Sequence, residues 1–220
     1  MEYTFPIPKK NELKRFYQQY NDFRADPEIV FLNARKHINV LKKYGWSYES
    51  LTLDFGAGKG EFVKVAGKKC YGIEWNSIPS GQIKKSIKDL HNFKWDFITL
   101  WGVLEHLPDP LDTMARLIAN LRYGGYIALT TVNAESEIPY YYKPPEHLSY
   151  WTRRAFEYLC ADLGLSIIDY YPYTMFQFST VYVERLLNRT PEKYRSNIQS
   201  QLPKIIEIPT NEVCVIIKKL

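Results

Sequence analysis

Three glycines at alternate positions follow an acidic residue at the end of a short apolar run. The segment of residues 51–63 has the sequence L-T-L-D-F-G-A-G-K-G-E-F-V, in which Asp54 precedes Gly56, Gly58 and Gly60. Glycine lets the backbone adopt left-handed conformations, and it lets a ligand approach the main chain closely. The pattern therefore predicts a ligand-binding turn after a strand, and the order of the glycines distinguishes between classes of ligand.

Two common nucleotide-binding patterns do not fit this turn. A loop for a nucleoside triphosphate needs G-x-x-x-x-G-K-[ST], but Gly60 follows Gly58-Lys59, and Leu53 stands where the first glycine belongs. The dinucleotide fingerprint needs a third glycine or an alanine, and Glu61 occupies that position. A carboxylate there would crowd the packing of helix against strand, which disfavours a nicotinamide cofactor.

The segments around the turn alternate between strand and helix patterns. Strands are predicted at residues 51–55, 69–74, 95–101, 126–132, 165–171 and 213–217, and helices at 61–66, from 109 to about 123, and at 152–163. This alternation predicts a doubly wound α/β fold, in which helices cover both faces of a mostly parallel sheet. Ligands of such sheets bind at the carboxyl ends of the strands.

The helix predicted after residue 109 has clear start and stop signals. It begins at Asp109-Pro110 and is expected to end at Gly124-Gly125. The side chains expected to face the core are Leu111, Met114, Leu117, Ile118 and Leu121.

Two helices are expected before the first strand. Leu13, Phe16, Tyr17 and Tyr20 form one apolar stripe at helical spacing, and Asp26-Pro27 begins a second helix that stops near Gly45. Residues 1–48 are therefore predicted to form a helical lid or brace on a domain of residues 49–220. Within that domain, residues 75–94 are short for a full helix and strand, and an insertion at 172–211 is expected to hold one or two extra helices.

Composition limits the class of protein. The 220 residues are 45% hydrophobic, which suffices for the core of one domain of ordinary size. The net charge of +5 lies in scattered lysine pairs, so nucleic acid is not expected as a partner. The three cysteines include no C-x-x-C pair and are expected to be reduced thiols. No apolar run reaches the roughly 18 residues of a membrane span, and no signal core is present, so a cytoplasmic protein is expected. Oligomeric state stays open.

The glycine turn resembles that of class I S-adenosylmethionine-dependent methyltransferases. The methionine end of this cofactor is zwitterionic and carries no phosphate, so its site needs close backbone approach and an acid that positions the ammonium group, directly or through water. The resemblance assigns the latter role to Asp54. Glu74, in Y-G-I-E-W-N after the second strand, is then expected to accept hydrogen bonds from both ribose hydroxyls.

Further resemblance points to the methyltransferases related to ubiquinone-type O-methyltransferases. It lies in W-D-F-I-T-L-W-G-V-L-E-H-L-P-D-P (95–110), in L-R-Y-G-G-Y-I-A-L-T-T-V-N (121–133) and in P-P-E-H-L-S-Y-W-T (144–152). Together these motifs span about residues 50–170. The cofactor-binding residues that the resemblance implies are Asp54, Gly56, Ala57, Gly58, Gly60, Glu74, Trp75, Trp101 and Gly102. Trp101 is expected beside the sulfonium or the adenine, and a packed strand end is the alternative.

Two of the four histidines are candidates for a catalytic base. His106 and His147 lie in segments expected at the carboxyl edge of the sheet, whereas His37 and His91 are assigned to surface or packing positions. His147 is slightly favoured, because Tyr140 to Tyr142, Tyr150 and Trp151 are near it in the sequence. The alternative for His106 is a structural histidine bonded to a backbone carbonyl.

A metal ion is not expected. Metal-dependent relatives resemble E-x-x-E-H at the position of residues 102–106, but Gly102 replaces the first acid and leaves only Glu105 and His106. Two ligands make a poor magnesium site.

The sequence therefore predicts an S-adenosyl-L-methionine-dependent methyltransferase with a small-molecule acceptor, at a hydroxyl of a sugar, lipid-like compound or other metabolite. An RNA or protein acceptor is the first alternative, although it would need a basic face that the scattered lysines do not establish. A non-catalytic module that binds the cofactor is the second. The acceptor atom itself stays open.

Overall fold

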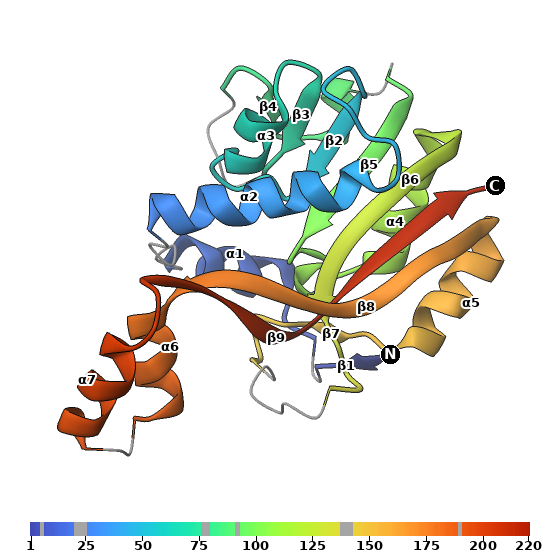
Figure 1. The fold of residues 1–220 in the computed structure, drawn as a ribbon. Coiled ribbons are helices and arrows are strands. Elements are labelled where there is room, and N and C mark those ends of the chain that lie inside the picture. Colours follow the sequence, from blue (N-terminus) through green and yellow to red (C-terminus); the bar gives the residue numbers. More distant parts are fainter. Residues whose placement is uncertain (5–6, 20–25, 76–79, 91–92, 137–142, 189–190) are drawn as a thin grey trace.

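A seven-stranded sheet with the order β4-β3-β2-β5-β6-β9-β8 forms the centre of the protein. The computed structural model describes residues 1–4, 7–19, 26–75, 80–90, 93–136, 143–188 and 191–220, and Figure 1 shows its elements. The strands of the sheet are β2 (Thr52–Phe55), β3 (Cys70–Ile73), β4 (Ile83–Lys84), β5 (Trp95–Trp101), β6 (Leu121–Val132), β8 (Leu165–Phe178) and β9 (Ile205–Lys219). A separate pair joins β1 (Glu2–Tyr3) to β7 (Ser149–Tyr150).

The five strands from β4 to β6 are parallel, and β9 runs antiparallel between β6 and β8. The chain leaves β2 toward β3 on one side, and β5 later pairs with β2 on the other side. The order of the strands therefore reverses at β2. In sheets of this kind, ligands bind outside the carboxyl ends of the strands at such a point.

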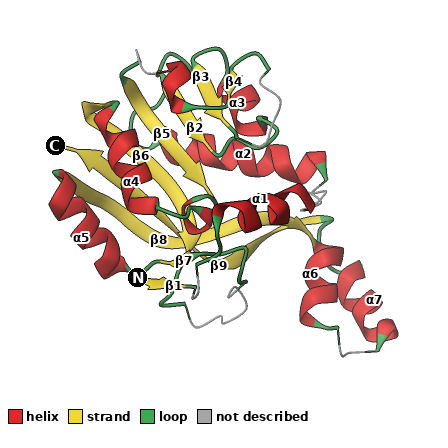
Figure 2. Ribbon diagram, turned by 180° about the vertical axis from the view of Figure 1, so that it is seen from behind, coloured by secondary structure: helices red, strands yellow, loops and turns green. Residues whose placement is uncertain are grey.

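Helices cover both faces of the sheet, as predicted. On one face are α2 (Pro27–Lys42) and α3 (Glu61–Ala66), in front in Figure 1, and on the other are α4 (Pro110–Ala119) and α5 (Arg153–Leu163), in front in Figure 2. Each face has its own core: Ile38 and Phe62 belong to the first, and Met114 and Phe156 to the second. The doubly wound α/β prediction is confirmed.

The helix starts follow the capping signals in the sequence. The Asp26 carboxylate accepts a hydrogen bond from the Glu28 amide at 2.8 Å, and Asp109 accepts one from the Asp112 amide at 3.0 Å. Each aspartate precedes a proline at the first helical position, where the missing amide hydrogen costs nothing. The expected starts of α2 and α4 are confirmed.

The predicted end of α4 is wrong. The helix ends at Ala119, and Gly124-Gly125 lie inside β6, which begins at Leu121. Gly125 is needed there because a side chain would meet the carbonyl oxygens of Arg122 and Asp96 at about 3 Å. Leu111, expected in the core, is 46% exposed in the first turn of the helix, so that expectation is wrong.

The segment of residues 172–211, expected as an insertion with one or two extra helices, holds two helices between the extended ends of two strands. β8 and β9 extend through much of it, and they carry two helices, α6 (Ser179–Leu186) and α7 (Glu192–Ser200). These helices project from the body beyond the end of the sheet (Figures 1 and 2). The region of residues 75–94 is abbreviated as expected, because its described part holds only β4 and a short 3-10 helix (Ile87–Leu90).

The helices before the first strand differ in their packing. α1 (Lys10–Gln19) buries Leu13, whereas α2 buries Ala34, Ile38 and Leu41 in the same core as α3. α2 therefore packs as part of the same domain as the sheet. The role of residues 1–48 as a lid or brace stays a prediction. Among the described residues, no helix has both the length and the apolar character that a membrane crossing needs.

Candidate active site

The glycine turn follows β2 at the point where the strand order reverses. The amides of Gly56 and Ala57 donate to the Ile73 carbonyl at 2.8 and 3.0 Å, which ties the turn to the end of β3. Gly56, Gly58 and Gly60 all have positive φ values, of 81°, 53° and 80°. A side chain at residue 56 would meet Val103 at 2.4 Å, whereas residue 58 has nothing within 4 Å. Gly56 is therefore required by packing, and Gly58 faces space that a ligand can use.

Glu74 joins the second strand to this turn. It follows β3 directly, and its Oε2 accepts a hydrogen bond from the Gly58 amide at 3.1 Å. The carboxylate is thereby held beside the open space at Gly58. Trp75, which comes next, is 54% exposed. The structure thus brings together the turn and the acid that the sequence assigned to one ligand.

Asp54 lies below the turn. Its side chain is 3% exposed, and its Oδ1 accepts a hydrogen bond from the Thr99 hydroxyl at 2.7 Å. Burial raises the pKa of this carboxyl to about 7, and the negative charges of Glu74 and Glu61 act in the same direction. Of the two roles foreseen for Asp54, the water-mediated one fits this burial better than direct contact.

The end of β5 lies next to the turn. Trp101 is its last residue, and the following Gly102, with φ of 62°, donates its amide hydrogen to the Thr130 hydroxyl at 2.9 Å. Trp101 is a partly exposed residue, and its ring stacks on the His37 ring, with centroids 3.9 Å apart and planes within 3°. Val103, which touches the Gly56 position, then leads into a short 3-10 helix (Leu104–His106).

This 3-10 helix carries an acid and an imidazole. Glu105 is buried, and its Oε2 accepts a hydrogen bond from the Thr131 hydroxyl at 2.8 Å. His106 Nδ1 lies 2.9 Å from the Glu146 carbonyl oxygen. Because a carbonyl only accepts, Nδ1 must donate, and Nε2 is the basic nitrogen of the neutral ring. Nε2 lies 3.9 Å from Glu105 Oε1.

His147 reaches the same place from a distant segment. Its ring centroid is 5.0 Å from that of His106. The segment is held by the Leu148 amide, which donates to the Glu105 carbonyl at 2.7 Å, and by the Thr4 hydroxyl, which donates to the His147 carbonyl at 2.7 Å. β1 and β7 therefore hold His147 beside His106, which the 3-10 helix after β5 places at the carboxyl edge of the sheet, where the sequence predicted both histidines.

Exposure distinguishes the two imidazoles. His147 is 5% exposed, whereas the His106 side chain is 26% exposed. Burial lowers the pKa of His106, so its neutral, basic form predominates at neutral pH. Of the aromatic residues expected around His147, Tyr150 lies beside it, with ring centroids 6.2 Å apart, and Trp151 packs in the core against Phe156. Tyr140 to Tyr142 lie outside the described residues. These facts favour His106 as the base.

A family model described as a methyltransferase domain matches residues 29–170. The chain belongs to this methyltransferase family. The match covers the sheet from β2 to the start of β8, and it includes α2, the glycine turn and both histidines.

Solved methyltransferase structures share the fold. A SAM-dependent methyltransferase from Archaeoglobus fulgidus is 21% identical, with 93% of this chain and 99% of that chain covered and a TM-score of 0.59. The plantazolicin methyltransferase BpumL in complex with SAH is 15% identical, with 98% and 92% covered and a TM-score of 0.55. A methyltransferase in complex with the Trm112 activator of Haloferax volcanii is 12% identical, with 94% and 97% covered and a TM-score of 0.63. No curated protein matches.

The methyltransferase has a third potential metal ligand that its sequence did not reveal. Atoms of Glu105, His106 and His147 that could bind an ion all lie within 4.8 Å of one another. The sequence motif contains only the first two, because His147 is 41 positions away from His106. Two imidazoles and one carboxylate suit zinc better than magnesium. The absence of a metal stays a prediction, and it now needs a direct test.

Three further residues near the site were missed by sequence reasoning. The first is Glu212 on β9, which is hydrogen-bonded to Thr130. Burial and the negative charge of Glu105 raise the pKa of Glu212 to about 7. The other two are His37 on α2 and Tyr173 on β8, whose side chains bond at 2.6 Å. Two signals were available: Glu212 is an acid beside the apolar run V-C-V-I-I, and His37 is a polar residue next to the buried Ile38 in a helix.

Proposed function

We propose that the protein is an S-adenosyl-L-methionine-dependent methyltransferase that acts on a small-molecule acceptor, at a hydroxyl of a sugar or metabolite, in the manner of the group related to ubiquinone-type O-methyltransferases. The observation that carries this proposal is the hydrogen bond between the Gly58 amide and Glu74 at the reversal point of the sheet. This hydrogen bond holds a carboxylate beside the exposed backbone of the glycine turn after β2. The Glu105, His106 and His147 cluster lies after β5, the strand next to β2.

The residues at the turn fit this cofactor. The space above Gly58 admits a ligand against the backbone. Glu74 would bind the ribose hydroxyls, because the Gly58 amide already orients its carboxylate. Asp54, buried under the turn, would help to position the ammonium group through water. Trp101 and Gly102 would border the sulfonium. When bound, the cofactor supplies a methyl group on a positively charged sulfur.

His106 would hold the proton that a hydroxyl acceptor loses. The Glu146 carbonyl fixes the Nδ1 hydrogen, so Nε2 is the atom that accepts a proton. The imidazolium formed in this way would be stabilised by Glu105, whose carboxylate lies 3.9 Å from Nε2. His147, more deeply buried beside it, would support the ring or share the proton.

β8 and β9 would border the acceptor, because they bring Tyr173 and Glu212 to the same edge of the sheet. Glu212 pairs with Val132 at the carboxyl end of β6, and the hydroxyl of Thr210, two residues before Glu212, donates to the Tyr173 carbonyl at 2.8 Å. Carboxylates accept hydrogen bonds from vicinal hydroxyls well. This arrangement supports an acceptor with several hydroxyl groups.

A transfer assay with a panel of hydroxylated metabolites tests the proposal. We expect S-adenosylhomocysteine to form only when an acceptor is present, and mass spectrometry of the product to show one added methyl group on oxygen. We also expect the rate to be unchanged after treatment with a chelator such as EDTA.

Three other results would contradict parts of this account. Transfer only to RNA or protein would replace the acceptor class. Binding of the cofactor without transfer to any acceptor would indicate a non-catalytic module. Loss of activity with the chelator, restored by zinc, would show that Glu105, His106 and His147 hold a metal ion.

A further inference from the structure

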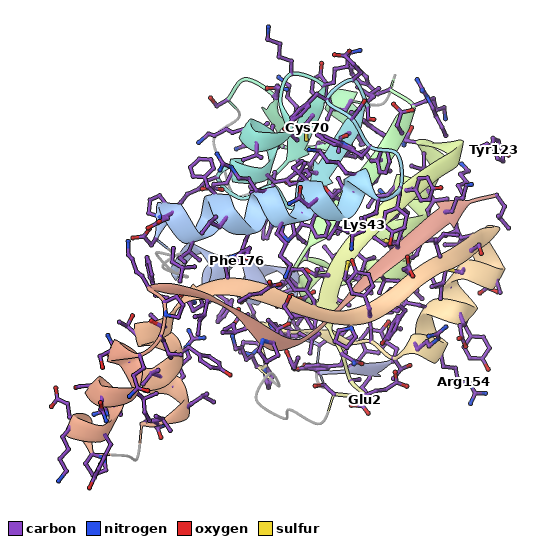
Figure 3. The ribbon with its side chains drawn as sticks, viewed as in Figure 1. Glu2, Lys43, Cys70, Tyr123, Arg154 and Phe176 are labelled. Atoms are coloured by element: carbon purple, nitrogen blue, oxygen red, sulfur yellow. The ribbon has the colours of Figure 1, made fainter. Side chains whose placement is uncertain are left out.

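One face of α2 is fixed to β8 by three side chains at helical spacing. Asn33 pairs with the main chain of Phe176, accepting from its amide at 2.8 Å and donating to its carbonyl at 3.1 Å. Phe176 lies on β8 beside α2 (Figure 3). Lys36 bonds to Thr174 and Glu207, one turn along the helix. These contacts set the position of the next residue, His37.

His37 connects β8 to β5 through its ring. Its Nε2 lies 2.6 Å from the Tyr173 hydroxyl, and its face lies parallel on the Trp101 indole at 3.9 Å. Phe62 packs against both, with ring centroids 6.2 Å from His37 and 5.9 Å from Trp101. A parallel stack held at one edge by a hydrogen bond has little freedom to tilt or slide. Trp101 is therefore held by His37 as well as by its own strand.

The stack borders the cofactor turn. Phe62 is the second residue of α3, which begins directly after Gly60, and Trp101 is the last residue of β5, the strand beside β2. One face of the indole is covered by His37, and the residue is still partly exposed at this edge of the sheet. A ligand that lies on the glycine turn and extends toward β5 would meet the indole.

The stack carries no charge. Burial, together with the charge of Lys36, lowers the pKa of His37 to about 3, and burial raises the pKa of Tyr173 above its usual range. Lys36, whose charge acts on His37, is itself paired with Glu207. A neutral imidazole does not repel a positively charged ligand, and an indole face attracts one.

We propose that His37 is a positioning residue for the cofactor's sulfonium: held by Tyr173, it fixes the Trp101 indole as an uncharged aromatic wall next to the donor sulfur. The inference rests on the proposed function, and it goes further by giving α2 and β8 a part in selecting the charged cofactor over its neutral product. S-adenosylmethionine carries the sulfonium charge and S-adenosylhomocysteine does not, so the two ligands separate this role from general support of the fold.

The test is calorimetric titration of the whole protein with each ligand, without an acceptor, for wild type, His37→Leu and Tyr173→Phe. We expect His37→Leu to weaken binding of S-adenosylmethionine about fivefold or more, within the range of a cation–π contact, and to change binding of S-adenosylhomocysteine by less than about twofold. Tyr173→Phe keeps the ring and removes only the hydroxyl, so a smaller shift in the same direction is expected. Asn39→Leu, on the exposed face of α2, is the matched control and should change neither affinity.

Equal loss of both affinities in the two variants would show that the stack only supports the fold, and unchanged affinities would show that it has no role in binding. Either result overturns the inference. If His37→Leu does not fold, the ratio of affinities in Tyr173→Phe decides alone. Failure of the wild type to bind either ligand would instead contradict the proposed function.

Discussion

Replacement of His106 by glutamine is expected to lower kcat at least about 100-fold and to leave the affinity for S-adenosylhomocysteine within about twofold. Glutamine can still donate to the Glu146 carbonyl, so the short helix should keep its shape, but its amide cannot take up a proton. Removal of a positioned base typically costs a factor of 10² to 10⁴. Steady-state kinetics with the unmethylated acceptor measures kcat, and calorimetry with S-adenosylhomocysteine measures the affinity.

His147→Gln is the comparison variant for this experiment. Because His147 is more deeply buried, we expect a smaller loss of kcat and a larger loss of thermal stability. A larger kcat effect at His147 than at His106 would reverse the assignment of the base. Unchanged kcat in both variants would exclude imidazole base catalysis.

The dependence of kcat/KM on pH follows from the same groups. A base acts only when deprotonated, and burial lowers the pKa of His106, so its contribution is lost only as the pH falls below about 6.5. Burial raises the pKa of Glu105 to about 7, so the carboxylate charge that stabilises the imidazolium is lost as the pH falls through about 7, before His106 is protonated. We therefore expect activity to fall in two steps as the pH is lowered, and the upper step to disappear in Glu105→Gln.

Gly56→Ala is expected to lower the free energy of unfolding by about 2 to 5 kcal/mol. The methyl group would lie 2.4 Å from Val103 Cγ2 in a backbone conformation with φ of 81°. The left-handed conformation alone costs about 1 to 2 kcal/mol, and overpacking adds about 1 to 3 kcal/mol. Because Val103 leads into the helix that carries His106, activity should fall as well.

Gly58→Ala is the matched control for Gly56→Ala. It has the same left-handed backbone, with φ of 53°, but no atom within 4 Å of the new methyl group. We expect the free energy of unfolding to fall by only about 1 to 2 kcal/mol and the cofactor affinity to fall sharply, because the methyl group would enter the ligand's space. Urea denaturation of both variants provides the comparison. Equal destabilisation would contradict the role given to Val103.

The central fold was predictable because its strands are short apolar runs with turn signals between them. β5 was predicted with the same bounds that the structure gives, and Asp26 and Asp109 marked two helix starts by capping chemistry. The outer strands were not predictable at full length. β8 extends over partly exposed residues without strict alternation, since bulges at Ile167/Asp169 and Pro172/Thr174 shift its register against β9.

In the candidate site, too, the residues placed by neighbouring strands were predictable, and those placed by contacts between distant segments were not. The glycine turn and Glu74 were predictable because they follow neighbouring strands, and parallel strands end at one edge. The approach of His147 to Glu105 depends on β1 pairing with β7, which joins the N-terminus to residues 149–150. Glu212 and the stack of His37 on Trp101 depend on β9 and α2, and no spacing in the sequence relates those elements to the glycines.

The most direct test of the cofactor assignment is calorimetric titration with S-adenosylhomocysteine of wild type, Glu74→Ala and Glu61→Gln. Glu61 is a second acid of the turn, in the first turn of α3, with no role assigned in binding. We expect micromolar binding by the wild type and a change below about twofold in Glu61→Gln. Glu74→Ala should bind at least tenfold more weakly, a loss of about 1.4 kcal/mol or more in binding free energy. Absence of binding by the wild type, or equal affinities of wild type and Glu74→Ala, would contradict the assignment.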